Sequence, residues 1–168
     1  MEFMLHIRPF QTQDMTAFLN AISDAAMLMQ FAGPSYEFPL TAAQVEIDLQ
    51  AADARVFSIV TDANQVVGHA QMQLLPNGFL LRRIVIWDAS LRGQGWGKKI
   101  MQQLLDLGYA WSPSKVAHLN VFDWNASAIR CYQSLGFVVQ EGVEKHVQVD
   151  NETWHSLHMC LQPSNKSI

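Results

Sequence analysis

The stretch from Ser90 to Lys99, S-L-R-G-Q-G-W-G-K-K, has the composition of a turn that holds a negatively charged group. It follows the apolar run 84–87, which predicts a strand, and it precedes residues 100–105, whose pattern predicts a helix. Its three glycines remove side chains from the turn and permit positive φ values. The N–H groups at a helix start attract anions, and three cationic side chains add to that attraction. The turn is therefore predicted to bind phosphate.

Two common nucleotide-binding patterns do not fit this turn. A P-loop requires a further glycine where Arg92 stands and a hydroxyl residue where Lys99 stands. The dinucleotide fingerprint requires its third glycine at the position of Lys98. The pattern that does fit is Gln/Arg-x-x-Gly-x-Gly/Ala, which is satisfied by Arg92, Gly95 and Gly97.

A second stretch, from Asn125 to Phe137, reads N-A-S-A-I-R-C-Y-Q-S-L-G-F. It satisfies every fixed position of the pattern Asn-x-x-Ala-x-x-x-Tyr-x-x-x-Gly-Phe. With both patterns in this order and at this spacing, the chain resembles the GNAT (Gcn5-related N-acetyltransferase) family over roughly residues 3–161. The resemblance implies a single N-acetyltransferase domain, 1–168, with acetyl-CoA as cosubstrate.

The resemblance also implies a role for each motif residue. Arg92 and the amides of Gln94 to Lys98 would bind the pyrophosphate of CoA, a backbone N–H of the preceding strand would polarise the thioester, and Asn125 would hold the pantetheine arm. The predicted acyl-CoA-binding residues are Ile84, Val85, Ile86, Leu91, Arg92, Gly93, Gln94, Gly95, Trp96, Gly97, Lys98, Asn125 and Tyr132.

Tyr132 is the predicted catalytic residue, and it would donate a proton to the departing CoA thiolate. The alternative is a core aromatic, because Ala128, Ile129, Tyr132 and Leu135 form one stripe at helical spacing. Asn125 has a compatible alternative role as a helix N-cap.

Acetyl transfer also requires an amine without its extra proton, since a free alkyl ammonium has a pKa of about 10.4. Asn120 stands where some relatives in this family carry Glu, and an amide cannot accept a proton at neutral pH. The candidate bases are Asp88, Glu37, His118 and Asp123, or a chain of ordered water leading to bulk solvent.

Other polar residues suggest further interpretations. Arg82 and Arg83 are adjacent in a predicted strand, so they are expected on opposite faces, with one of them available to a carboxylate or phosphate of the acceptor. His155 and His158 are likewise expected on opposite faces, so no metal site is predicted. Cys131 is not expected to carry an acyl group.

Charge is unevenly distributed over the 168 residues, whose net charge is −4. Five of the eleven Lys and Arg fall between positions 82 and 99 beside one acid, Asp88. A basic patch on an otherwise acidic chain suits a small polyanion and an amine rather than nucleic acid. Two cysteines and no long apolar run predict a cytoplasmic protein without a membrane partner.

Hydrophobic periodicity and turn signals predict the order β, α, α, β, β, β, α, β, α, β, β. One helix is expected over 14–29 and another after Thr41, with Val45 and Leu49 on its buried face. The fold class is α/β, a mixed α+β sheet flanked by helices, and the resemblance implies that this sheet splays open between strands 79–87 and 115–122.

The predicted function is acetyl transfer from acetyl-CoA to an amine, a small molecule or a peptide N-terminus, by direct attack in a ternary complex. Acceptor identity would depend on residues 31–40 and the final hairpin. The alternative is a non-catalytic acyl-CoA-binding sensor of the same fold. A homodimer through the terminal strands is a further expectation.

Overall fold

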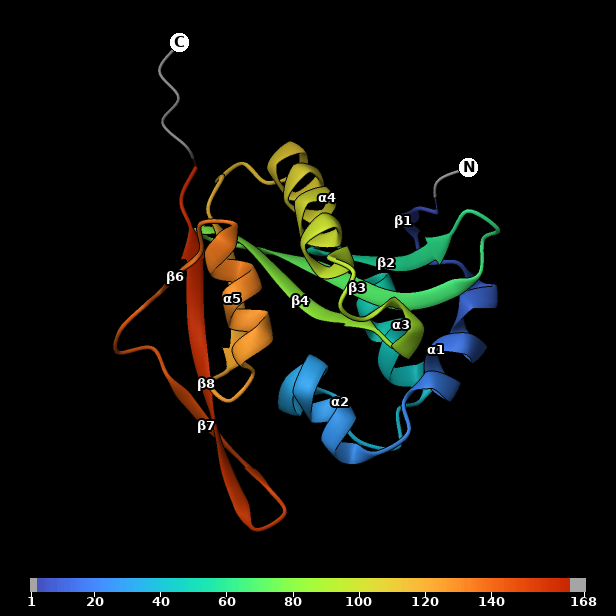
Figure 1. The fold of residues 1–168 in the computed structure, drawn as a ribbon, viewed down its shortest axis with the longest axis horizontal. Coiled ribbons are helices and arrows are strands. Elements are labelled where there is room, and N and C mark those ends of the chain that lie inside the picture. Colours follow the sequence, from blue (N-terminus) through green and yellow to red (C-terminus); the bar gives the residue numbers. More distant parts are fainter. Residues whose placement is uncertain (1–2, 164–168) are drawn as a thin grey trace.

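The computed structural model describes residues 3–163, which form a mixed β-sheet with helices on both faces (Figure 1). Its eight strands are β1 (Leu5–Pro9), β2 (Ala54–Thr61), β3 (Val66–Leu75), β4 (Gly78–Ile86), β5 (Ala117–Phe122), β6 (Val138–Val139), β7 (Lys145–Val149) and β8 (Glu152–Leu161). Their order in the sheet is β1-β2-β3-β4-β5-β8-β6, and β7 pairs with the other half of β8. Only the β4–β5 pair is parallel within these residues. The predicted mixed sheet is confirmed.

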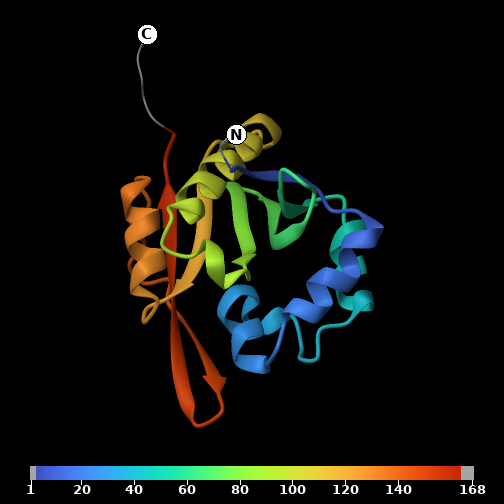
Figure 2. The ribbon, with the colours of Figure 1, turned by 45° about the vertical axis from the view of Figure 1, so that its right-hand side comes forward.

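Two groups of helices cover the two faces of the sheet (Figure 2). The helices are α1 (Met15–Ala21), α2 (Ala25–Ala32), α3 (Ala42–Gln50), α4 (Trp96–Trp111) and α5 (Ala126–Ser134). Strand β2 shows how the sequence separates the faces: Phe57 and Ile59 enter the core under α4, whereas Ser58 between them bonds to Asp14 on the opposite face. This alternation is the two-residue period of a strand.

The single helix expected over 14–29 is wrong, because the chain breaks between α1 and α2. Asp24 is extended, with φ −158°, and its carboxylate accepts a hydrogen bond from the N–H of Met27 at 2.7 Å. An aspartate in this position caps a new helix. The apolar residues keep their helical spacing across the break, so their periodicity cannot reveal where the first helix ends.

Asp14 is a buried carboxylate near the start of α1 that accepts hydrogen bonds from Arg8, from Gln11 N–H and from the hydroxyl of Ser58. Burial alone would raise the pKa of Asp14, but these bonds outweigh it and lower the pKa below the ordinary value. A carboxyl group with a depressed folded-state pKa stabilises the protein above its unfolded pKa, and that contribution disappears as the pH falls.

Asp14→Asn is therefore expected to lower the free energy of unfolding by about 1–3 kcal/mol at pH 7. The difference from the parent protein should shrink on acidification below about pH 4, where the unfolded carboxyl takes up its proton. Urea unfolding at several pH values measures this. Asp24→Asn is the matched control, because asparagine caps a helix as well as aspartate does. An equal loss of unfolding free energy at every pH would show that the charge of Asp14 does not cause the stabilisation.

The sheet opens between β4 and β5, where the ladder contains only the pairs Phe79–Ala117 and Leu80–His118. At the closed end, Gly78 lies so close to β5 that a Cβ atom would come within 2.1 Å of the Val116 carbonyl oxygen. Beyond these pairs the strands diverge, and Figure 1 shows β4 running away from β8, with α2 near the open end. The predicted splay is confirmed, at the predicted strands.

Strands β7 and β8 form a hairpin with Asp150 in its turn, at φ 54°. Figures 1 and 2 show this hairpin extending away from the body of the sheet. Within residues 3–163, none of the helices combines the length and the apolar character that crossing a membrane requires.

Candidate active site

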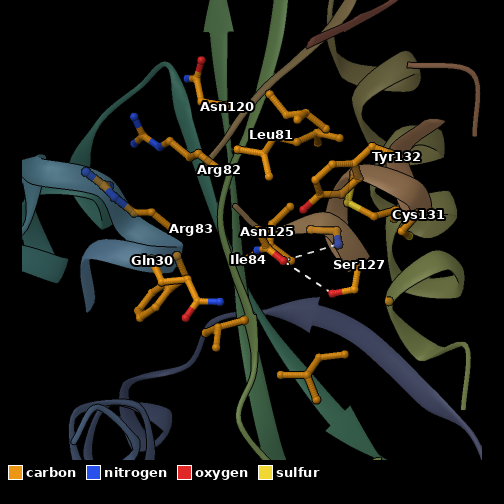
Figure 3. A pocket seen from close by; sticks show the side chains of 18 of the residues that line it. Gln30, Leu81, Arg82, Arg83, Ile84, Asn120, Asn125, Ser127, Cys131 and Tyr132 are labelled. Carbon is orange, nitrogen blue, oxygen red and sulfur yellow. Dashed lines mark hydrogen bonds between the residues drawn. The ribbon is translucent and has the colours of Figure 1, made fainter. Parts of the chain in front are cut away.

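A cavity of about 640 Å³ occupies the gap between the diverging strands (Figure 3). Strand β4 forms one wall, β5 and α5 form the other, and α2 lies across its open side. Seven of the predicted binding residues line this cavity: Ile84, Val85, Ile86, Arg92, Gly97, Asn125 and Tyr132. The two sequence motifs therefore meet at one cavity, although 28 residues separate Gly97 from Asn125.

The start of α4 borders this cavity and has the groups that an anion site requires. Gly95, with φ 80°, is the N-cap residue and offers no side chain to the helix. The first N–H groups of a helix have no partner within the helix, and the helix dipole makes that end positive. Arg92 lines the cavity just before this turn. N–H groups and a guanidinium at one end of a cavity fit a pyrophosphate.

The remaining predicted binding residues do not line the cavity. The side chains of Leu91 and Trp96 are buried in the main hydrophobic core. Gly93, Gln94, Gly95 and Lys98 belong to the turn and to the first turn of α4. From this segment we therefore expect the backbone N–H groups and the cationic side chains of Arg92 and Lys98 to contact an anion.

The edge of β4 that faces β5 has no ladder partner beyond Leu80 in the part of the chain that the structure describes. A β-bulge lies in the same segment: the pairs His69–Val85 and Gln71–Arg82 leave two residues of β4 opposite one residue of β3. Bulges redirect backbone groups. This combination supports the expectation that a backbone N–H near Ile84 can bind a ligand in the gap.

Tyr132 packs its ring against the core, where it meets Phe137 at a centroid distance of 6.1 Å. Figure 3 shows its hydroxyl pointing into the cavity. Burial, with a smaller contribution from Cys131, raises the pKa of Tyr132 to about 12. The phenol therefore keeps its proton at neutral pH. The two interpretations of this residue are compatible, since its ring is core and its hydroxyl faces the cavity.

Asn125 also combines two roles. Its side-chain oxygen accepts a hydrogen bond from Ala128 N–H at 3.4 Å, so it caps α5, and the residue lines the cavity (Figure 3).

Arg82 and Arg83 were expected on opposite faces of the strand, and this expectation is wrong. Both guanidinium groups bond to the side-chain oxygen of Gln71, at 3.2 and 2.8 Å, and both contact Asp48. The reason is the bulge: Arg83 has φ 51°, outside the extended region, so the alternation of side chains fails there. Both arginines line the cavity.

A second cavity, of about 460 Å³, adjoins the first and shares Arg82, Arg83 and Asn120 with it. Its outer wall includes Lys145 and His146 of β7. Neither cavity is lined by a carboxylate among residues 3–163. The combined space therefore has a cationic end at the start of α4 and a second cationic region toward the β7–β8 hairpin.

Comparison with known proteins identifies the family. Residues 25–137 match the model of the acetyltransferase (GNAT) family, which is more than half of the chain. The chain belongs to the GNAT family of acetyltransferases.

Solved structures of GNAT acetyltransferases have the same fold. Spermidine N-acetyltransferase from Vibrio cholerae, in complex with CoA and spermine, superposes with a TM-score of 0.77 at 16% identity and with 94% of each chain covered. A candidate phosphinothricin N-acetyltransferase gives a TM-score of 0.78 at 15% identity, covering 96% of this chain and 100% of the other. A dodecameric form of the Vibrio cholerae enzyme gives 0.72 at 15% identity, covering 94% and 93%.

The candidate bases of this GNAT protein all lie off the walls of both cavities. Asp88 accepts hydrogen bonds from the N–H and hydroxyl of Ser90, and these bonds lower the pKa of its carboxyl. His118 is buried on the β5–β8 sheet, whereas Glu37 and Asp123 are exposed. None of the four is placed to take a proton from an amine in the cavity.

A buried polar network beneath the arginines escaped the sequence analysis. Asp48 contacts both guanidinium groups and accepts a hydrogen bond from the hydroxyl of Tyr36, whose ring lies 3.8 Å from the Arg83 guanidinium carbon. Helix α3 was expected to bury Val45 and Leu49, but it buries Val45 and Asp48, and Leu49 is exposed. The sequence did contain one signal: Asp48 follows Val45 by three positions, so both lie on the same face of the helix.

Gly97 provides a test of the anion site. A Cβ atom added there would meet no protein atom within 4 Å, and its φ is not positive, so the fold itself does not require glycine. Gly97→Ala is expected to leave the free energy of unfolding unchanged or raise it by up to about 1 kcal/mol. The Kd for acetyl-CoA should rise at least ~10-fold, since glycine permits close approach of backbone to phosphate.

Calorimetric titration and urea unfolding measure the two effects of Gly97→Ala. Gln102→Ala, an exposed change on the same helix, is the control and should alter neither. Unchanged acetyl-CoA affinity in Gly97→Ala would show that the ligand does not approach this residue.

Proposed function

We propose that this protein is an acetyl-CoA-dependent N-acetyltransferase that acts by direct attack of an amine in a ternary complex. The observation that carries the proposal is a pair of adjoining cavities that share Arg82, Arg83 and Asn120. The first lies beside the uncapped start of α4 and the Tyr132 hydroxyl, and the second lies near β7. Each cavity can hold one of two substrates. The CoA bound to the Vibrio cholerae relative supports the choice of cosubstrate.

Each residue then has a definite task. Arg92 and the amides of residues 94–98 bind the pyrophosphate, and a backbone N–H among Ile84–Ile86 stabilises the oxyanion that forms at the thioester carbonyl. Asn125 binds the pantetheine arm. Tyr132 donates a hydrogen bond to the sulfur as the carbon–sulfur bond breaks and negative charge develops there.

The cationic walls also bear on how the amine loses its proton. A free alkyl ammonium, with a pKa of about 10.4, is neutral in fewer than about one molecule in 10³ at pH 7, whereas an α-amino group with a pKa near 7.7–8.0 is neutral in roughly one in ten. Like charge nearby disfavours the protonated form further. Arg82, Arg83 and Lys145 thus favour a neutral amine without a carboxylate base, and its proton passes to water.

The same cations define the class of acceptor that we propose: an α-amine that carries a carboxylate or another anionic group. Arg82 and Lys145 can bind the anion, and a guanidinium binds a carboxylate with two parallel hydrogen bonds. A polyamine, the substrate class named for the Vibrio cholerae relative, would bring several positive charges against this wall. Both a small molecule and a peptide terminus remain within this class.

A panel of amino acids, each assayed beside its carboxamide and with spermidine as a further amine, tests the proposal through release of CoA. The best amino acid is expected to have a kcat/KM at least ~10-fold above its amide, the value of one charge-assisted hydrogen bond. Arg82→Gln should abolish this preference while retaining turnover of the amide. A higher rate with spermidine than with every amino acid would contradict the proposed class.

The same assay separates catalysis from a non-catalytic acyl-CoA sensor. Tight binding of acetyl-CoA, with no CoA release from any amine in the panel, would favour the sensor.

We further propose a single domain over residues 1–168, a cytoplasmic location and a homodimer. Both cysteines are free thiols, which is usual in the cytosol. The dodecamer of the Vibrio cholerae relative supports self-association, and size-exclusion chromatography with light scattering tests it.

A further inference from the structure

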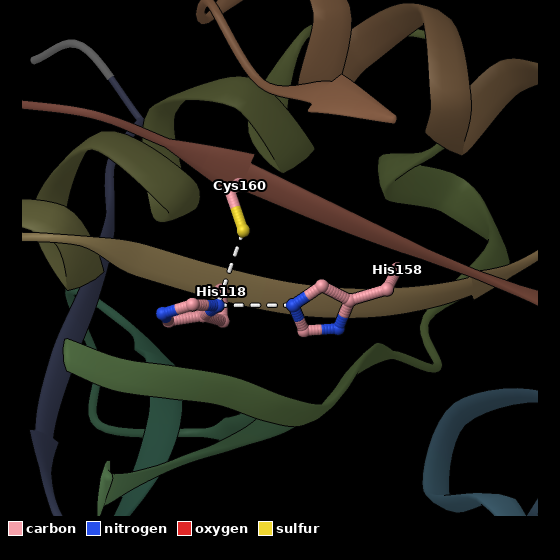
Figure 4. A group of neighbouring side chains, drawn as sticks. All are labelled: His118, His158 and Cys160. Carbon is pink, nitrogen blue, oxygen red and sulfur yellow. Dashed lines mark hydrogen bonds between the residues drawn. The ribbon is translucent and has the colours of Figure 1, made fainter. Parts of the chain in front are cut away.

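Three metal-ligand side chains meet on the face of β5 and β8 that is turned away from α4 and α5 (Figure 4). The Nδ1 atom of His118 lies 2.9 Å from Nε2 of His158 and 3.1 Å from Sγ of Cys160. His118 and Cys160 are buried, whereas His158 is partly exposed.

Strand register explains the cluster. His118 stands opposite Cys160 in the antiparallel pair, and Asn120 stands opposite His158. Residues two apart on a strand share a face, so all four side chains project to the same side. The separation of 42 residues between His118 and Cys160 hides this grouping in the sequence. The sequence analysis considered His158 only with His155, whose ring packs instead on His146.

Hydrogen-bond contacts of the outer ring nitrogens orient both imidazole rings. Nδ1 of His158 lies 3.0 Å from the side-chain oxygen of Asn120, and Nε2 of His118 lies 3.3 Å from the backbone carbonyl oxygen of Asn77. In the tautomers in which the outer nitrogens donate to these oxygens, the inner nitrogens, Nε2 of His158 and Nδ1 of His118, present their lone pairs to a metal ion.

The donor set suits Zn²⁺. Two imidazole nitrogens and one thiolate are ligands that zinc prefers, at about 2.0–2.1 and 2.3 Å, which places the donors roughly 3.3–3.6 Å apart in a tetrahedron. The observed spacings of 2.9 and 3.1 Å are a few tenths of an ångström shorter, within reach of small side-chain rotations. Hydrogen bonds from outer ring nitrogens to oxygen are the usual support of metal-binding histidines.

Binding of the metal by Cys160 also requires the loss of a proton, because the thiolate is the ligand. On binding, the sulfur forms the metal bond and its proton passes to solvent, which makes metal affinity increase with pH.

We propose that His118, His158 and Cys160 bind one Zn²⁺ ion, with a fourth position open to water on the exposed side of His158. The ion clips β5 to β8 and, through His158, fixes the side chain of Asn120, which lines both cavities. This site is independent of the proposed acetyl transfer, since it requires neither acetyl-CoA nor an acceptor.

Titration of the full chain, freed of metal by a chelator, with Co²⁺ and then with Zn²⁺ tests the proposal. Co²⁺ should bind with a stoichiometry of one and give a thiolate charge-transfer band in the near ultraviolet together with the strong visible bands of a tetrahedral site, and Zn²⁺ should displace it. Cys160→Ser and His158→Gln should weaken Zn²⁺ binding at least ~100-fold. Asn120→Val should weaken it ~10–100-fold, because valine cannot accept the hydrogen bond that orients the His158 ring.

Cys131→Ser and His155→Gln are the matched controls, because they remove the other cysteine and another histidine of β8 without touching the cluster. Both should bind Zn²⁺ as the parent chain does. Equal affinity in Cys160→Ser, loss of binding in either control, or no binding by the parent chain at micromolar Zn²⁺ would each overturn the proposal. The Co²⁺ spectrum of the parent chain tests the proposal even if the variants do not fold. Bound Co²⁺ without a thiolate band in that spectrum would also overturn the proposal.

Discussion

Tyr132→Phe is expected to lower kcat by about 10²–10⁴-fold while leaving the Kd for acetyl-CoA within a few-fold of the parent value. Only the hydroxyl is removed, and it points into the cavity, where it has no hydrogen-bond partner among residues 3–163. The ring, which packs on Phe137, is retained, so the free energy of unfolding should change little. Steady-state kinetics, binding calorimetry and urea unfolding together measure the three quantities.

The pH dependence sharpens this prediction. Because burial raises the pKa of Tyr132 to about 12, this phenol should not titrate in the range where the enzyme is assayed. Any rise of kcat/KM between pH 6 and 9 should then report deprotonation of the amine, and it should persist in Tyr132→Phe with the same midpoint.

Tyr109→Phe is the control for a lost phenol elsewhere. Tyr109 lies on α4, where its ring meets Phe79 edge-on at 5.6 Å, and it lines neither cavity. Its kcat should match that of the parent. If Tyr132→Phe turned over at the parental rate across this pH range, the residue would be a core aromatic with no part in catalysis.

Features that depend on nearby residues were predictable from the sequence. The glycine turn before α4, the Pro76-Asn77 connection between β3 and β4, and the helix that begins at Asn125 are each encoded within a few positions. The splay between β4 and β5 followed from the family resemblance, not from composition. Local signals thus placed both motifs on the elements that now border one cavity.

Features that depend on register between distant strands were not predictable. The bulge at Arg83 arises where β4 pairs with β3, and it reverses the expected direction of one arginine. His118 and Cys160 become neighbours only through the pairing of β5 with β8. The burial of Asp48 was not predicted either, because a buried carboxylate requires partners that no local pattern reveals.

Asp48→Asn is expected to lower the free energy of unfolding by about 3–5 kcal/mol, the usual effect of removing one partner from a buried ion pair. The carboxylate contacts Arg82 at 3.1 Å, also contacts Arg83, and accepts a hydrogen bond from Tyr36. Without it, the two guanidinium groups retain only neutral partners, including Gln71. Urea unfolding measures the loss. Glu46→Gln, an exposed change on the same helix, should stay within about 0.5 kcal/mol of the parent.

The same substitution is expected to improve binding of an anionic acceptor. Asp48 offsets one of the two arginine charges, so its removal raises the net charge at that wall from +1 to +2. The KM for the best amino acid should therefore fall, most clearly at low ionic strength, where charge interactions are least screened. The KM for the corresponding amide should not fall, because the amide carries no negative charge.

A loss of stability together with a lower KM for the anionic acceptor would distinguish an acceptor site from a purely structural ion pair. If Asp48→Asn destabilised the protein and left the KM of acid and amide equally changed, the arginines would serve only to hold α3 against the sheet. A parental stability would instead show that Gln71, together with Ser35, whose hydroxyl oxygen accepts a hydrogen bond from Arg83 at 2.7 Å, satisfies both cations. The expected pattern implies that this carboxylate orders two cations at the acceptor end and still leaves one positive charge uncompensated for a substrate.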